Sequence, residues 1–229
     1  MIILHGDNNE LSRQRLRQEI ERFKQKGKGE FLRFEAGELR LLELKQALAS
    51  PTLMGQNQLV LVENLFGSRR TKEKEKIIDD LKKSLPRNLI IWEAKKIDGR
   101  FLTAFKNQIL LRFDLPAVVF KFLDSLAPKS AQNSLPLLHQ SLTQNSPEMV
   151  FYLLARQIRL LILAVDLGKT GLASMEPWRQ EKLIRQGQKF GLKELLRIYR
   201  DLLRIDTQQK TGQSPFPLVS QLDLLIASL

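Results

Sequence analysis

Short apolar runs alternate with amphipathic stretches along the first half of the chain. The runs Leu59–Val62 and Leu89–Trp92 are continuously apolar. Continuous runs of this length are typical of strands buried on both faces of a sheet, and sheets of that kind are parallel. We therefore expect five parallel strands, within the segments 1–6, 30–37, 57–65, 88–96 and 107–116.

The stretches between these runs have helical periodicity. Leu16, Ile20 and Phe23 recur at a spacing that places them on one face of a helix. The same periodicity marks the segments 11–27, 37–50 and 71–87. An alternation of strands and helices predicts right-handed crossovers and a three-layer α/β domain.

The strand pattern stops at Pro116, and only helical periodicity follows. Ser146 is a suitable N-cap for a long helix, with Pro147 at its first position. We expect an α/β domain over residues 1–115 and an all-helical bundle over residues 116–229. The expected helical segments are 117–126, 134–144, 146–168, 176–191, 192–212 and 215–229.

The composition narrows the function classes. Net charge is +12, from 37 basic and 25 acidic residues. A basic chain favours a polyanionic partner, nucleic acid above all, although a basic surface kept for solubility is the alternative. The absence of cysteine excludes disulfides and thiolate metal sites, and it fits a reducing cytosol. No secretory signal and no apolar run of roughly 18 residues is visible, so we expect a cytoplasmic protein without membrane contact.

The first strand and helix lie where nucleotide-binding α/β domains carry their phosphate loop. Such a loop needs a second glycine to wrap the phosphates, a lysine and a hydroxyl. Gly6 matches the first glycine, but Leu11, Ser12 and Arg13 stand at the three later positions. We expect no bound nucleotide and no other cofactor.

Candidate catalytic groups are few. Glu63 and Glu93 end two expected strands, where a carboxylate can bind magnesium, but solvated strand-end residues are the simpler interpretation. His5 is expected to be structural and His139 to be half-exposed on a helix. No nucleophile, paired carboxylate or metal-ligand spacing appears, so the sequence predicts neither catalytic residues nor a metal site.

Three stretches resemble one known family. They are residues 47–65, residues 149–164 and residues 178–229, the last with an Asp206–Lys210–Gly212 step. Their order and spacing are similar to the delta subunit family of the bacterial DNA polymerase III clamp loader. The small helical lid that normally separates the two domains of this family is almost absent here.

The resemblance implies an AAA+-like domain with an inactive phosphate loop, followed by a helical collar domain. It implies a subunit that binds and opens the ring-shaped sliding clamp (beta) for loading onto primed DNA during replication, without binding ATP itself. The other implied partners are the gamma/tau and delta prime subunits, reached through the collar domain. The chain would be a monomer when isolated. It would have no catalysis of its own and would be a nucleotidyltransferase only as part of the polymerase holoenzyme.

The resemblance also implies a clamp-binding tip at Leu53 and Met54. Pro51 and Gly55 flank this pair, so two apolar side chains would be held on a turn between a helix and a strand. Methionine suits an adaptable pocket. The alternative is that both side chains fold back onto their own core.

The basic residues allow two interpretations. Lys95, Lys96 and Arg100 follow an expected strand at the sheet edge where ligands usually bind, so they are candidates for DNA phosphate contact. The run Ser68–Lys76 could serve similarly, or could simply be the solvated start of a helix. Arg156 and Arg159 could meet partner subunits or pair internally.

Two rival functions remain open. One is a stand-alone basic DNA-binding protein on a degenerate phosphate-loop scaffold, which would bind duplex DNA alone with a steep dependence on salt. The other is an NTPase with an unusual loop, which would need measurable nucleotide affinity. Trp92 and Trp178 are expected in the core, so no aromatic platform for single-stranded bases is predicted.

Overall fold

The chain forms two compact units, Met1–Leu115 and Pro116–Leu229, in a computed structural model. The structure describes residues 1–25, 29–49, 58–67, 71–84, 86–105 and 108–229. Each unit has its own arrangement of elements, and each is described by itself.

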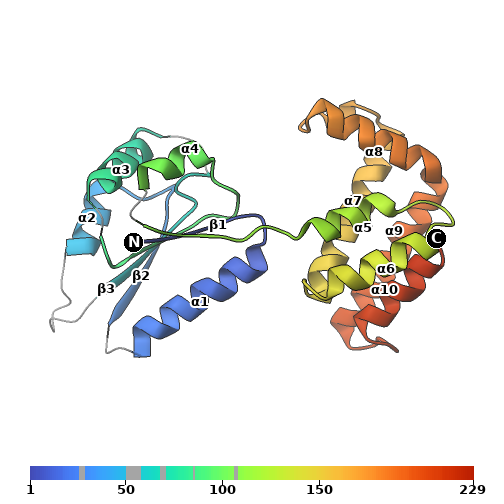
Figure 1. The fold of residues 1–229 in the computed structure, drawn as a ribbon, viewed down its shortest axis with the longest axis horizontal. Helices are drawn as coiled ribbons and strands as arrows, with labels where there is room; N and C mark the ends of the chain where they lie inside the picture. The colour runs from blue at the N-terminus through green and yellow to red at the C-terminus, as the bar shows by residue number, and fades with distance from the viewer. Residues whose placement is uncertain (26–28, 50–57, 68–70, 85, 106–107) are drawn as a thin grey trace. The chain divides into compact units, whose positions relative to one another are not determined.

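The N-terminal unit is built on five parallel strands in the order β2–β3–β4–β1–β5. Figure 1 labels β1, β2 and β3 of this sheet. The five-stranded parallel sheet expected from the sequence is confirmed. Its elements are β1 (Ile2–His5), α1 (Asn9–Gln25), β2 (Glu30–Glu35), α2 (Leu41–Ala49), β3 (Gln58–Glu63), α3 (Lys72–Lys83), β4 (Leu89–Trp92), α4 (Gly99–Leu102), a 3₁₀ turn (Thr103–Phe105) and β5 (Ile109–Arg112).

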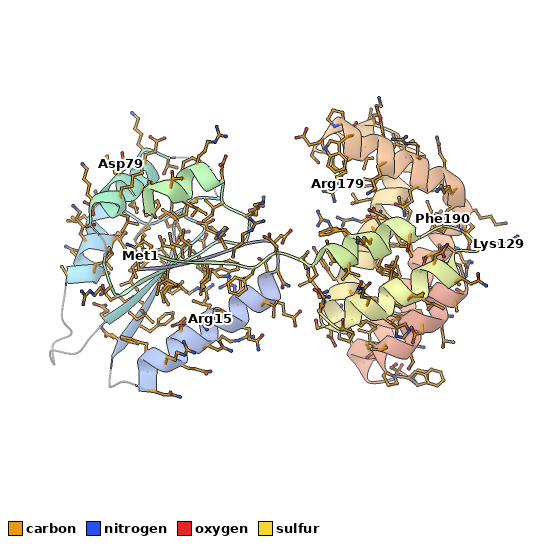
Figure 2. All side chains as sticks on the ribbon, viewed as in Figure 1. Met1, Arg15, Asp79, Lys129, Arg179 and Phe190 are labelled. Atoms are coloured by element: carbon orange, nitrogen blue, oxygen red, sulfur yellow. The ribbon has the colours of Figure 1, made fainter. Side chains whose placement is uncertain are left out.

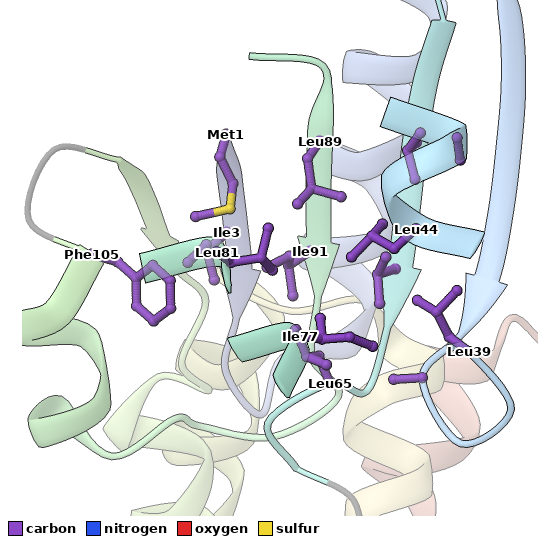
Figure 3. Close-up of a cluster of buried hydrophobic side chains, with 14 of the residues drawn as sticks. Met1, Ile3, Leu39, Leu44, Leu65, Ile77, Leu81, Leu89, Ile91 and Phe105 are labelled. Atoms are coloured by element: carbon purple, nitrogen blue, oxygen red, sulfur yellow. The ribbon is translucent and has the colours of Figure 1, made fainter. Parts of the chain in front are cut away.

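Alternate residues of β3 belong to two different cores. Leu59 and Leu61 pack in a cluster with Leu16 of α1. Val60 and Val62 belong to a second cluster, which draws on α2 and α3 and is shown in Figure 3. Because successive side chains of a strand point to opposite faces, the sheet is covered on both sides and the unit has three layers.

The two edge strands differ from the expected pattern. Every residue of β3 and β4 is buried, but β2 and β5 are partly exposed, and Ile109 of β5 is 56% exposed. The prediction of burial on both faces, drawn from continuous apolar runs, is therefore wrong for β5, the second of these two edge strands. Each of these strands has a neighbour on one side only, so solvent reaches it from the other.

The C-terminal unit is all-helical, as expected. Its elements are α5 (Ala117–Ser125), α6 (Ala131–Leu142), α7 (Pro147–Asp166), a 3₁₀ turn (Thr170–Leu172), α8 (Pro177–Phe190), α9 (Leu192–Thr211) and α10 (Leu218–Ala227). Helix α7 contacts every other α-helix of the unit and is its central element. It begins where the sequence predicts, because the Ser146 hydroxyl accepts a hydrogen bond from the Met149 N–H at 3.3 Å.

Helices α7 and α8 approach closely at one glycine. A Cβ on Gly187 would lie 2.7 Å from Val165 Cγ2 and 3.1 Å from the Leu161 carbonyl oxygen. Nearby, the buried Gln186 donates to the carbonyls of Leu123 and Leu126, at 2.8 and 3.0 Å. The contact at Gly187 packs α8 on α7, and the hydrogen bonds of Gln186 join α8 to the end of α5.

No helix in the described ranges is long and apolar enough to cross a membrane.

Candidate functional site

The loop after β1 is fastened to the chain that leaves β5. Gly6 has a φ of +137°, and a Cβ there would lie 1.9 Å from the Phe113 carbonyl oxygen. The Asn8 N–H donates to that oxygen at 2.9 Å, and Asp7 Oδ1 accepts from the Leu115 N–H at 2.8 Å. Glycine is required at position 6 because β5 passes so close, which explains this glycine without a phosphate.

The N-terminus of α1 is already capped. Asn8 is buried, and its side-chain oxygen accepts from the Leu11 N–H at 3.2 Å. A phosphate would need the free N–H groups of this helix end. Asp7 and Glu10 are exposed beside it, and their negative charges oppose a second anion.

Ser12 stands where a phosphate loop has its lysine, and its side chain is committed elsewhere. The residue is fully buried. Its hydroxyl oxygen accepts from the Trp92 indole N–H at 3.1 Å, which joins α1 to the end of β4.

Arg13 occupies the next position and lies over the same indole, with its guanidinium carbon 3.4 Å from the ring centroid. It donates two hydrogen bonds of 2.8 Å to the two carboxylate oxygens of Glu63, at the end of β3. Arg33 of β2 completes the group with its Nε 2.8 Å from Glu63 Oε1. Together, Ser12, Arg13, Arg33, Glu63 and Trp92 are called the strand-end cluster.

Glu63 is held as a charged group by this cluster. The residue is 2% exposed, and burial alone would raise its pKa. Hydrogen bonds from Arg13 and Arg33 outweigh the burial, so the pKa is lowered. The expectation of a solvated strand-end residue is wrong for Glu63. Its charge is instead neutralised by two guanidinium groups, which leaves little reason for it to hold a magnesium ion.

Glu93, at the end of β4, is also buried but has a different role. Its two oxygens accept from the Phe66 N–H at 2.6 Å and from the Gly67 N–H at 2.9 Å. Burial raises its pKa despite these hydrogen bonds. The carboxyl group therefore shapes the loop after β3, and the expectation of a solvated side chain is wrong here too.

The histidines take structural positions. His5 is buried, and its Nδ1 accepts from the Ile97 N–H at 3.2 Å. Burial and the charge of Arg112 both lower its pKa, so the ring is neutral at neutral pH. The His139 side chain is 57% exposed and lies 3.0 Å from Asp223. Within the described ranges, His, Asp and Glu side chains form no group of three that could hold a metal ion.

Two of the three candidate phosphate contacts lie at this edge of the sheet. Lys95 and Lys96 are exposed directly after β4, and the Lys95 carbonyl accepts from the Gly6 N–H at 3.3 Å. Arg100, on α4, is also exposed but pairs with Asp98 at 3.0 Å. The structure thus brings Lys95 and Lys96 beside the loop after β1, whereas the charge of Arg100 is already balanced.

The expected clamp-binding pair, Leu53 and Met54, lies outside the described residues, in the segment 50–57 between α2 and β3. The basic run Ser68–Lys76 is described only from Thr71 onward. There, the Thr71 hydroxyl caps α3 by accepting from the Lys74 N–H at 3.3 Å, and Lys76 pairs with Glu73 at 2.7 Å. The described part of this run is therefore a helix start.

Two aromatic expectations have different outcomes. Trp92 is buried as predicted, at the centre of the strand-end cluster. Trp178 is 65% exposed at the start of α8, so its expected place in the core is wrong. Arg156 and Arg159 are exposed on α7, and no carboxylate of the described residues pairs with either.

Comparison with known proteins adds one decisive observation. Residues 117–227 match the family model of the DNA polymerase III delta subunit, C-terminal domain. This match covers nearly all of the C-terminal unit, Pro116–Leu229. The resemblance to the delta family that the sequence indicated is thereby confirmed.

Two further comparisons do not assign a family. No curated protein matches the chain. Among solved structures, the Bacillus subtilis DNA clamp loader delta protein is similar to the chain at 17% identity, over 98% of this chain and 93% of that one, with a TM-score of 0.43. The family assignment of the delta-like C-terminal unit rests on its family model match.

Proposed function

We propose that this chain is the delta subunit of a clamp loader, which binds and opens a ring-shaped sliding clamp for loading onto primed DNA. The observation that carries the proposal is the family match of residues 117–227. In this proposal the C-terminal unit is the collar domain, joined to gamma/tau and delta prime subunits. The N-terminal unit is a degenerate AAA+ domain that contacts the clamp.

The strand-end cluster supports a role without ATP. Ser12 and Arg13, at two of the positions where a phosphate loop holds its lysine and hydroxyl, are bonded to Trp92 and Glu63. Glu63, at the strand end where a magnesium ligand would stand, is neutralised by Arg13 and Arg33. Binding a nucleotide as a phosphate loop does would require Arg13 to leave Glu63 and Trp92, so in this proposal ATP binding and hydrolysis belong to the partner subunits.

Clamp opening would depend on the segment that contains Leu53 and Met54. Burial of two large apolar side chains in a groove of the clamp contributes about 1.5–3 kcal/mol each. If the groove is better formed in the open ring, that energy shifts the clamp toward opening. The chain then does its work by binding alone.

The test is a titration of the full chain against the sliding clamp of the same organism. Leu53→Ala/Met54→Ala is compared with Leu42→Ala, which removes another exposed leucine, from α2. We expect the double variant to lose at least about tenfold in affinity and the control to stay within about twofold. Circular dichroism checks that both variants are folded.

Absence of clamp binding by the wild-type chain would contradict the proposal. Strong salt-sensitive binding to duplex DNA in the same assay would then favour the stand-alone DNA-binding protein. Saturable binding of ATP by the isolated chain would instead favour the NTPase.

A further inference from the structure

The C-terminal unit has a groove between α5, α7 and α8 with an apolar floor. Its volume is about 250 Å³, and its floor includes the buried side chains of Leu153 and Leu183. Phe120 and Trp178 stand at its sides, 41% and 65% exposed. Large exposed aromatic side chains beside an apolar floor are typical of a surface that binds another molecule.

The polar groups at the floor are already satisfied. Gln157 donates to Gln186 Oε1 at 2.8 Å, and Gln186 donates onward to the Leu123 and Leu126 carbonyls. An occupant therefore meets an apolar surface rather than hydrogen-bonding groups in need of partners.

The rim of the groove is positive. Arg156 of α7 and Arg179 of α8 line it, and neither pairs with a carboxylate of the described residues (Figure 2 labels Arg179). Lys182 also lines it, but pairs with Asp124 at 2.5 Å. Two unpaired guanidinium groups beside an apolar floor favour an occupant that carries both apolar and acidic side chains.

Shape narrows the occupant further. A small-molecule site usually needs about 300–1,000 Å³, so this groove has room only for one or two anchoring side chains. The unit has no strand whose edge an extended peptide could join. An amphipathic helix, which inserts anchors from one face, fits a groove between helices.

We propose that this groove docks an acidic amphipathic helix of a partner protein, with an aromatic or leucine anchor on the Leu153–Leu183 floor and carboxylates on Arg156 and Arg179. The proposal goes beyond clamp binding and rests only on the C-terminal unit. Clamp affinity through Leu53 and Met54 is measured separately, so failure of either proposal is distinguishable from failure of the other.

The test uses the full chain labelled with 5-fluorotryptophan. The chain has two tryptophans, so two fluorine resonances are expected, and a Trp178→Phe variant assigns them. Trp178 reports on the groove, whereas the buried Trp92 of the N-terminal unit is the internal reference. The probes are two synthetic helical peptides of about 18 residues with the same leucine and tryptophan anchors, one with glutamates and one with lysines at the other positions. The peptides contain ordinary tryptophan, so every fluorine resonance comes from the labelled protein.

We expect the glutamate peptide to shift the Trp178 resonance saturably, with a Kd below about 100 µM, and to leave Trp92 unchanged. Arg156→Glu or Arg179→Glu should weaken this binding at least about fivefold. Arg159→Glu is the matched control, because it changes the same charge one turn along α7 and does not line the groove. It should stay within about twofold.

Each of the following outcomes would overturn the proposal. One is no shift of Trp178 at about 1 mM glutamate peptide. The second is equal binding of the lysine peptide, or equal weakening by Arg159→Glu. The third is a larger Trp178 shift with duplex DNA than with the peptide, which would make this a nucleic-acid surface. The fourth is a Trp178 shift that changes with protein concentration alone, which would make the occupant a second copy of the chain.

Discussion

The Arg13 side chain makes two kinds of interaction, one with an aromatic ring and one with a carboxylate. Its guanidinium stacks on the Trp92 ring and forms bidentate hydrogen bonds with the Glu63 carboxylate. Stacking and paired hydrogen bonds both need the planar arginine head, and a lysine could supply neither geometry. The cluster therefore fixes α1 against the ends of β3 and β4, where another protein could hold a phosphate.

Replacing Glu63 with glutamine tests the energetic role of this cluster. Glu63→Gln removes the charge that Arg13 and Arg33 share, and we expect a loss of about 1–3 kcal/mol in the free energy of unfolding. The range lies below the cost of breaking a fully buried pair because both arginines are partly exposed. Urea unfolding at neutral pH measures it. Glu30→Gln, at the exposed start of β2, is the control and should stay within about 0.5 kcal/mol.

The same variant predicts a pH dependence with a definite sign. The pKa of Glu63 is lowered in the folded state, so its stabilisation is present above the unfolded pKa of about 4.3 and is lost as pH falls through the folded pKa. The difference in unfolding free energy between wild type and Glu63→Gln should therefore shrink between about pH 6 and pH 3. A difference that stays constant over this range would show that the carboxylate charge contributes nothing.

The strand-end cluster shows what sequence reasoning could and could not predict at single residues. The failed phosphate-loop pattern at Leu11, Ser12 and Arg13 correctly directs attention to this place. The burial of Glu63 was not predicted, because its partners Arg13 and Arg33 are distant in sequence. In the structure, Arg33 pairs in register with Leu61, which puts it diagonal to Glu63 on the same face of the sheet, and the sequence alone does not give that register.

At the scale of elements, the β1–α1 connection depends on close backbone approach rather than on a ligand. Gly6 has a φ of +137°, and a Cβ at this position would lie 1.9 Å from the backbone carbonyl oxygen of Phe113. Backbone cannot move aside as a flexible side chain can. The connection is therefore held by β5, the Asn8 cap and the Asp7 hydrogen bond to Leu115.

Gly6→Ala is expected to lower the free energy of unfolding by about 3 kcal/mol or more, because the strained φ and the backbone clash add. Gly37→Ala is a matched control, since a Cβ there meets nothing within 4 Å. It should change stability by less than about 1 kcal/mol. Thermal unfolding of both variants measures the difference, and equal effects would contradict the close approach of β5.

Element types were easier to predict than their environments. Apolar runs, together with the alternating segment 30–37, identified all five strands, because both patterns can be seen in the local sequence. The same runs did not reveal that β2 and β5 form the edges, because strand order depends on pairing across the whole sheet. Trp178 illustrates the limit in helices: the pattern of α8 cannot distinguish a core tryptophan from one that borders a groove.

At the scale of the whole molecule, the excess of positive charge is spread over both units. Much of it is paired on helix surfaces, as in Lys76–Glu73, Lys82–Asp79 and Lys210–Asp206. Unpaired cations at defined places are therefore more informative than the net charge of +12. Lys95 and Lys96 are the candidates at the carboxyl edge of the sheet, where ligands of α/β domains bind.

We expect Lys95→Glu/Lys96→Glu to weaken binding of the full chain to primed duplex DNA by about tenfold at low salt. It should also reduce the slope of log K against log salt by about 1–2, since each lost phosphate contact accounts for about 0.9. Fluorescence anisotropy at several salt concentrations gives both quantities. Lys121→Glu/Lys169→Glu, in the C-terminal unit, makes the same change in net charge and should have a much smaller effect. Equal effects of the two double variants would show that DNA affinity depends only on the total charge. Lys95 and Lys96 would then be solvated surface residues.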